Sequence, residues 1–284
     1  MTDYQLNYDV LKQVCRERSV IRNVSKHRKS DGTIDREGNL RIWNDAIARF
    51  KQTLLWEDGA PNYDDRDPLQ PPPSLIFIPA RGTGERRGTV IVACGGGFET
   101  RTGCEGFHVA EYFTDAGFNT AVLTYRLKPY SRWDAMADMQ RAIRLLRARK
   151  EEFGITDKVA AMGFSAGGML SANCATHFDL GDPAAADPVE RESCRPDGAV
   201  LGYGAFAFAG AFAAAGFLAG AFFAAGVFSV PAASAGADFS TGLSVVSISF
   251  VSISGFFFGM LFPHFKVFAA VPRNVTLPYY SLSG

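Results

Sequence analysis

One short segment constrains the fold of this chain more than any other. Residues 163–168 read Gly-Phe-Ser-Ala-Gly-Gly; the apolar run 159–162 precedes them and the helix-forming run 169–172 follows. A G-x-S-x-G sequence between a buried strand and a helix is typical of a sharp turn that raises the serine hydroxyl above the edge of a sheet. Because bulk beside such a turn would collide with neighbouring backbone, its flanking residues lack a Cβ. The pattern therefore predicts that Ser165 is a nucleophile on a strand–turn–helix unit.

A second glycine-rich segment lies upstream. Residues 94–98 read Cys-Gly-Gly-Gly-Phe and close the predicted strand 89–93. A glycine loop in this place lets backbone N–H groups approach a developing alkoxide closely, and each such donor contributes about 2.7–4 kcal/mol. The alternative is a tight turn that needs glycine only for its φ angles. The elbow downstream favours an oxyanion hole made by the N–H groups of Gly96 or Gly97 and of Ala166.

These motifs and their flanks carry a family resemblance. The matching segments are 55–61 (LWEDGAP), 94–98 (CGGGF), 122–127 (VLTYRL), 162–168 (MGFSAGG), 175–178 (ATHF) and 195–203 (RPDGAVLGY). Together they resemble the acetylxylan-esterase-like branch of the α/β-hydrolases, a group of bacterial carboxylesterases. The resemblance implies an ester hydrolase with a Ser-His-Asp triad. In one departure, Cys94 stands where many relatives have His or Pro, which leaves the backbone donors of the oxyanion hole unchanged.

The alternation of elements predicts an α/β fold, the α/β-hydrolase fold, with a mostly parallel central sheet and helices on both faces. Apolar runs predict strands at 75–78, 89–93, 119–125, 158–162 and 199–201, with helices near 106–116 and over 134–150. Residues 1–55 are charged and mainly helical in pattern, with an apolar stripe between Leu40 and Phe50. We expect residues 1–55 to form an N-terminal helical cap or extension and residues 56–284 the catalytic domain.

The predicted helix 134–150 has one apolar face, made by Met136, Met139, Ile143 and Leu146. Arg141 and Arg144 point away from that face in a helical projection, which predicts a solvated surface rather than a basic binding stripe. Asp134 is expected to cap the N-terminus of the helix.

Composition narrows the functional classes. The 284 residues suit one large domain, and 29 basic residues balance 29 acidic ones, so charge favours no nucleic-acid partner. The N-terminus has no signal-peptide pattern. Five cysteines without regular spacing indicate reduced thiols in a cytoplasmic protein. The sequence spacing of Cys and His predicts no metal site, no cofactor is expected, and the oligomeric state is left open.

The composition changes abruptly after Gly202. Residues 201–284 contain three charged side chains, Asp238, Lys266 and Arg273. Residues 205–230 are apolar and long enough to span a bilayer as a helix. That interpretation conflicts with the fold, because this region should supply a lid, two strands and surface helices, which need a polar face. A shifted reading frame is a second interpretation. A third interpretation, which the composition favours, is that the residue identities in this segment were inferred from something other than a gene sequence.

A nucleophilic serine needs a histidine base and a carboxylate that orients it, and this fold orders them Ser, acid, His along the chain. His264 is the histidine in the expected C-terminal place, and Asp238 is the carboxylate between Asp197 and His264. His177 falls on the helix after the elbow and is expected to pack or cap there. Asp179 and Asp182 are alternative acids by charge, and we expect them to be surface groups.

The leading hypothesis is a serine carboxylesterase acting on small acyl esters, acetyl above all, of sugars or xylo-oligosaccharides. One alternative is a non-catalytic α/β-hydrolase-like protein that binds a ligand or partner. Another is a membrane-attached lipase, which the apolar segment 205–230 would anchor.

Overall fold

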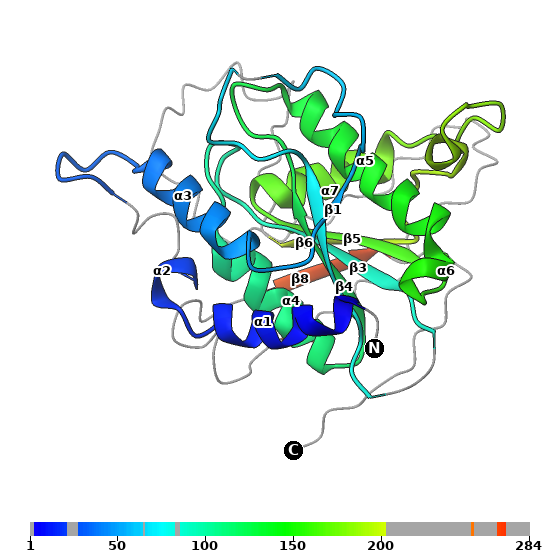
Figure 1. Ribbon diagram of the computed structural model, residues 1–284, viewed down its shortest axis with the longest axis horizontal. Coiled ribbons are helices and arrows are strands. Elements are labelled where there is room, and N and C mark those ends of the chain that lie inside the picture. Colours follow the sequence, from blue (N-terminus) through cyan, green and yellow to red (C-terminus); the bar gives the residue numbers. More distant parts are fainter. Residues whose placement is uncertain are drawn as a thin grey trace, which may run out of the picture.

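The computed structural model describes residues 3–21, 28–64, 66–82, 86–202, 251–252 and 266–270. Its centre is an eight-stranded sheet in the order β1-β2-β4-β3-β5-β6-β8-β7 (Figure 1). The strands are β1 (Thr53–Leu54), β2 (Ser74–Ile78), β3 (Thr89–Ala93), β4 (Asn119–Thr124), β5 (Val159–Phe164), β6 (Gly198–Gly202), β7 (Val251–Ser252) and β8 (Lys266–Ala270).

The middle of the sheet is parallel and its two sides are antiparallel. β4, β3, β5 and β6 are parallel neighbours. β1 and β2 extend one side of this group in antiparallel register, and β8 and β7 extend the other. Every residue of β2, β3 and β4 is buried, as expected for strands covered on both faces. The predicted α/β fold with a mostly parallel central sheet is confirmed.

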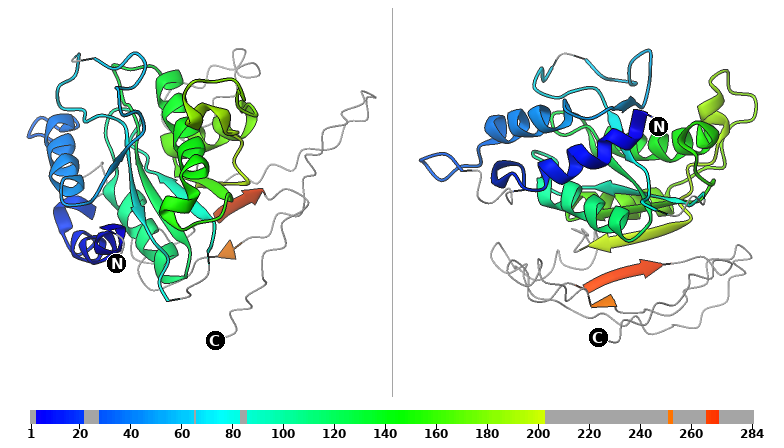
Figure 2. Two further views of the ribbon diagram at one scale, coloured as in Figure 1. Left: turned by 45° about the vertical axis from the view of Figure 1, so that its right-hand side comes forward. Right: turned by 60° about the horizontal axis from the view of Figure 1, so that its bottom comes forward.

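Helices cover both faces of the sheet (Figure 2). They are α1 (Leu6–Val14), α2 (Arg18–Ile21), α3 (Arg36–Ile47), the π-helical turn η3 (Cys104–His108), α4 (Val109–Asp115), α5 (Arg132–Ala148), α6 (Lys150–Phe153) and α7 (Ala166–Thr176), with short 3₁₀ turns η1 (Asp3–Gln5) and η4 (Pro188–Arg191). Because successive strand residues point to opposite faces, each face of the sheet packs its own apolar side chains. Leu75, Phe77 and Ile91 pack with α5 and α7, whereas Ile76 and Val122 pack with α1, α3 and α4.

The arginines of α5 correct the sequence-based prediction. Arg141 and Arg144 are buried, with 6% and 7% of their surfaces exposed, so the prediction of a solvated face is wrong. The segment after α7 lies over this face and supplies the carboxylates. Arg141 is 2.6 Å from both Asp187 and Glu190, and Arg144 is 2.5 Å from Asp179. A helical projection shows what points away from the sheet, but not that another segment covers it.

The start of α5 also differs in detail from the prediction. The N-cap is Ser131, whose side chain accepts from the Asp134 N–H, while the Asp134 carboxylate accepts from the Ser131 N–H at 2.9 Å. Asp134 therefore lies at the third helical position of a capping box rather than at the cap itself.

The N-terminal segment packs tightly onto the sheet. Trp43 of α3 packs against Phe107 with the rings tilted and their centroids 5.0 Å apart, and Leu11 of α1 is fully buried in the same core as Ile76. The Asn39 side chain donates to the Arg101 carbonyl oxygen and accepts from the Arg101 N–H, with a distance of 2.9 Å for each hydrogen bond. The domain boundary at residue 55 stays a prediction. Within the described segments, no helix is long and apolar enough to cross a membrane; residues 205–230 lie outside them.

Candidate active site

Ser165 occupies the turn between β5 and α7. Its backbone has φ +49° and ψ −114°, outside the regions that residues with a Cβ ordinarily adopt. Such a conformation costs about 1–3 kcal/mol and persists only where the surrounding structure enforces it. The Ser165 N–H donates to the Gly202 carbonyl of β6 at 3.0 Å, and α7 begins at the next residue. The predicted strand–turn–helix elbow is confirmed, and Ser165 is half-buried at its apex.

The glycines beside Ser165 are required by close backbone contacts. A Cβ on Gly163 would lie 2.2 Å from the Gly167 carbonyl carbon and oxygen. A Cβ on Gly167 would lie 2.1 Å from the Ala93 carbonyl oxygen at the end of β3. These contacts are with backbone, which cannot rotate away as a side chain could. The collision expected from the sequence is therefore present, and it ties the elbow to the neighbouring strand.

The glycine loop after β3 lies directly against the elbow. A Cβ built on Gly95 would be 2.8 Å from the Phe164 carbonyl oxygen and 3.0 Å from the Ser165 Cβ. Gly96 has φ +135° and Gly97 has φ +66°, conformations that favour glycine. The structure thus brings together the two motifs that the sequence singled out.

A buried carboxylate holds this loop. The Gly95 N–H donates to Glu105 Oε2 at 2.7 Å, and only 8% of Glu105 is exposed. The Gly95 N–H is therefore engaged within the protein, which leaves the next amides, of Gly96 and Gly97, as the donors proposed for the oxyanion. Sequence reasoning missed Glu105, because nothing in its local pattern distinguishes it from a surface acid at the start of a helix.

Two buried side chains lie next to the glycine loop: Cys94, which is uncharged, and Arg101, whose charge is stabilised by aromatic rings. Cys94 is fully buried, and burial raises the pKa of its thiol to about 12, so it stays protonated and does not compete with Ser165. Its carbonyl accepts from the Tyr125 hydroxyl at 2.7 Å. The buried guanidinium of Arg101 donates to the Tyr125 carbonyl and lies 5.5 Å from the Trp43 ring, a cation–π contact. These contacts fix the base of the loop.

The remaining predicted site residues divide into two groups. Asp238 and His264 lie outside the described residues, so the structure does not place the acid or the base. His177 is exposed and forms the C-cap of α7, with Nδ1 2.9 Å from the Thr176 hydroxyl, as expected for a capping residue. It lies at the opposite end of α7 from Ser165. Asp179 and Asp182 are exposed, as expected.

The comparison with known families agrees with this geometry. The BD-FAE family model matches residues 75–186, a span that contains both the glycine loop and the elbow. Residues 75–186 are therefore similar to the BD-FAE family. The members of the BD-FAE family are α/β-hydrolase esterases, that is, carboxylic ester hydrolases. The match agrees with the acetylxylan-esterase-like resemblance seen in the sequence. The BD-FAE segment covers the sheet from β2 to β5 and the whole of α7.

Individual relatives extend the comparison. Endo-1,4-beta-xylanase B of Butyrivibrio fibrisolvens is 29% identical over 220 residues, which are 71% of this chain and 33% of that protein. An acetyl ester-xyloside bifunctional hydrolase from Caldicellulosiruptor lactoaceticus is 36% identical, with a TM-score of 0.49, over 52% of this chain and 54% of that one. Esterase 2 of Thermogutta terrifontis, in a butyrate-bound structure, is 21% identical, with a TM-score of 0.41, over 52% and 51%. The chain thus spans about a third of the curated relative and about half of these structures.

Proposed function

We propose that this protein is a serine carboxylesterase that hydrolyses small acyl esters, acetyl esters above all, of sugars or xylo-oligosaccharides. The observation that carries the proposal is the Ser165 elbow, strained at φ +49° and packed against the glycine loop, whose amides we propose as the oxyanion donors. The BD-FAE match supports ester chemistry. The similarity to a protein named as a xylanase supports a xylan-derived substrate.

In the proposed mechanism, Ser165 Oγ attacks the ester carbonyl while His264 takes its proton. The carbonyl oxygen becomes an oxyanion and accepts from the N–H groups of Ala166 and of Gly96 or Gly97. His264 then donates its proton to the leaving sugar oxygen as the C–O bond of the tetrahedral intermediate breaks, which releases the alcohol and leaves an acyl-Ser165 ester. Water, deprotonated by the same histidine, attacks this ester, and the histidine returns that proton to the leaving Ser165 oxygen as the acid is released. Asp238 orients His264 and stabilises the imidazolium.

Substitution of the nucleophile tests the proposal. Ser165→Ala is expected to lower kcat for 4-nitrophenyl acetate at least ~10⁴-fold with an unchanged circular dichroism spectrum. A fluorophosphonate should label the unmodified protein at Ser165, as located by peptide mass spectrometry, and should not label Ser165→Ala. Ester hydrolysis that survives Ser165→Ala would refute the mechanism. An unmodified protein that neither hydrolyses esters nor reacts with the probe would instead favour the non-catalytic binding protein.

Two further variants test the acid and the base separately from the nucleophile. His264→Gln should lose about as much activity as Ser165→Ala, and Asp238→Asn should lose less, because a triad acts as a unit whose acid contributes least. Acetate release from acetylated xylo-oligosaccharides, compared with butyryl and octanoyl esters of 4-nitrophenol, tests the acyl length. Preference for the octanoyl ester, with partition into detergent, would favour the lipase alternative.

A further inference from the structure

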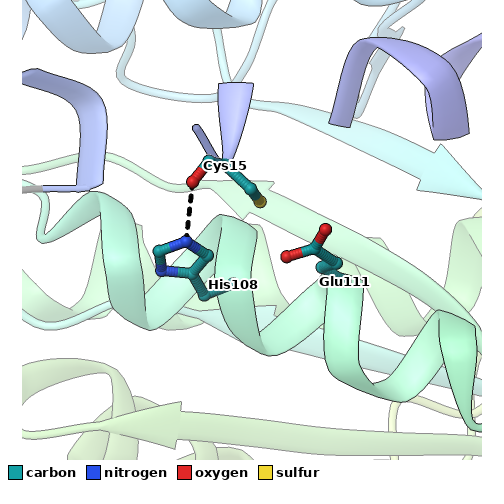
Figure 3. Close-up of side chains that lie close together, drawn as sticks. All are labelled: Cys15, His108 and Glu111. Atoms are coloured by element: carbon teal, nitrogen blue, oxygen red, sulfur yellow. Dashed lines mark hydrogen bonds between the residues drawn. The ribbon is translucent and has the colours of Figure 1, made fainter. Parts of the chain in front are cut away.

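A second cluster of reactive side chains lies between the N-terminal segment and the helix that follows the glycine loop. Cys15, at the C-terminal end of α1, points between His108 and Glu111 (Figure 3). The thiol sulfur, an imidazole nitrogen and a carboxylate oxygen of these residues all lie within 4.8 Å of one another. Only 7% of Cys15 is exposed, and the other two residues are half-buried. Neither the elbow nor the oxyanion loop uses any of the three.

The backbone holds the three side chains on one spot. His108 ends the π-helical turn η3 and Glu111 lies in the first turn of α4, three residues later, so their side chains share a helix face. The His108 ring is fixed against α1, because Nε2 is 2.9 Å from the Cys15 carbonyl oxygen. A carbonyl only accepts, so this nitrogen carries the proton in the hydrogen-bonded state. π-helical turns occur frequently at functional sites.

The donor set has a definite chemical preference. One thiolate, one imidazole and one carboxylate are the ligands of four-coordinate Zn²⁺, with the fourth position open to water. From ordinary Zn–S, Zn–N and Zn–O lengths, the ligand atoms of a tetrahedral site are about 3.4–3.6 Å apart. Separations of up to 4.8 Å need to shorten by at most about 1.4 Å, a movement within the range of side-chain rotation.

The surrounding charges fit a divalent cation once the thiol is ionised. Lys12 Nζ is 2.9 Å from Glu111 and 2.5 Å from Asp115, the residue one turn farther along α4. Lys12 therefore keeps a carboxylate partner when Glu111 turns to a metal. Thiolate, Glu111, Asp115 and Lys12 then carry a net charge of −2, which a divalent ion neutralises.

We propose that Cys15, His108 and Glu111 bind a divalent ion of the Zn²⁺ class, which fastens α1 to α4. Binding releases the thiol proton to solvent, and the imidazole carries its proton on the ring nitrogen that does not bind the metal. The proposal replaces the expectation of no metal, which rested on sequence spacing alone. It is independent of the esterase proposal, since none of the three residues belongs to that mechanism.

Cobalt titration tests the site, because Co²⁺ reports its ligands by absorbance. The EDTA-treated full chain is expected to bind one Co²⁺ with thiolate-to-metal charge transfer in the near ultraviolet, and Zn²⁺ should displace it. Cys15→Ser should abolish the charge-transfer band, and His108→Gln and Glu111→Gln should each weaken binding at least 10-fold. The matched control is Cys104→Ser, which removes a half-buried free thiol outside the cluster and should bind like the parent. Ser165→Ala should also bind like the parent.

Two results would overturn the proposal: no one-to-one binding by the parent chain, or a charge-transfer band that persists in Cys15→Ser. A second measurement needs no variant and so does not depend on folding of the mutants. Zn²⁺ should slow alkylation of Cys15 by N-ethylmaleimide at least 10-fold and leave that of Cys104 unchanged, as mapped by peptide mass spectrometry. Equal alkylation of Cys15 with and without Zn²⁺ would contradict the site.

Discussion

The strained backbone at Ser165 can be measured by comparing two substitutions at the same position. Both Ser165→Ala and Ser165→Gly remove the hydroxyl, but only glycine adopts φ +49° and ψ −114° without strain. The strain that alanine retains is about 1–3 kcal/mol. Glycine loses about 0.4–1 kcal/mol through the greater freedom of its unfolded chain. We therefore expect Ser165→Gly to be more stable than Ser165→Ala, by about 1 kcal/mol.

Urea unfolding followed by circular dichroism measures this difference, and thermal unfolding should show Ser165→Gly melting roughly 2 °C higher. The matched control is Ala172→Gly in the ordinary helical part of α7, which should destabilise by about 1 kcal/mol. The sign of the difference in unfolding free energy between Ser165→Gly and Ser165→Ala shows whether the backbone at position 165 is strained. If Ser165→Gly is the less stable variant by about 0.4–1 kcal/mol, the value for an unstrained position, the elbow stores no strain and the reasoning fails.

Three further predictions concern the loop, the elbow and an ion pair. Glu105→Ala leaves the buried Gly95 N–H without its acceptor, so kcat should fall by up to ~10²-fold with little change in KM, whereas Glu105→Gln should retain more activity. Gly167→Ala places a Cβ 2.1 Å from backbone and should destabilise by about 3 kcal/mol or more in urea unfolding, against about 1–2 kcal/mol for Gly154→Ala, whose Cβ meets nothing. Burial alone would raise the pKa of Asp197. The hydrogen bond from the Val159 N–H and the Arg147 guanidinium 2.6 Å away lower the pKa by more than burial raises it, so its net value lies below 3.8. The ionised Asp197 carboxylate therefore stabilises the fold above pH 3.8, and this stabilisation is lost as the pH falls through the pKa of the folded state. The free energy of unfolding of Asp197→Asn should be about 1–3 kcal/mol lower than that of the parent at pH 6, and the difference should shrink below pH 4.

The parts of the site that the sequence predicts are those set by local backbone geometry. Gly163 and Gly167 flank Ser165 at fixed spacing because a Cβ at either would strike backbone. A strand reads as an apolar run because both faces of the sheet are covered. These constraints act within a few residues, so they are written into short patterns. The alternation of strands and helices along the chain, and with it the confirmed α/β fold, follows from the same patterns.

The parts that could not be predicted depend on contacts between distant segments. Arg141 and Arg144 become buried only because residues 177–197 fold back over α5 and bring their carboxylates with them. Glu105 becomes a partner of Gly95 only because η3 returns beneath the glycine loop. The residues next to Arg141, Arg144 and Glu105 in the sequence do not indicate that these side chains are buried. Polar residues in a helical pattern are ordinarily exposed, so exposure is what the sequence predicts.

The same argument explains why spacing was a poor guide to metal chemistry here. A sequence motif reveals a metal site when its ligands share one short loop or one helix face, as His108 and Glu111 do at three residues apart. Two ligands at that spacing occur on many surface helices and predict nothing. The third, Cys15, comes from 93 residues earlier and reaches His108 because α1 packs across α4. The N-terminal segment thus does more than cover the sheet: it contributes the sulfur, and the proposed ion would make the packing of α1 depend on metal as well as on the apolar core.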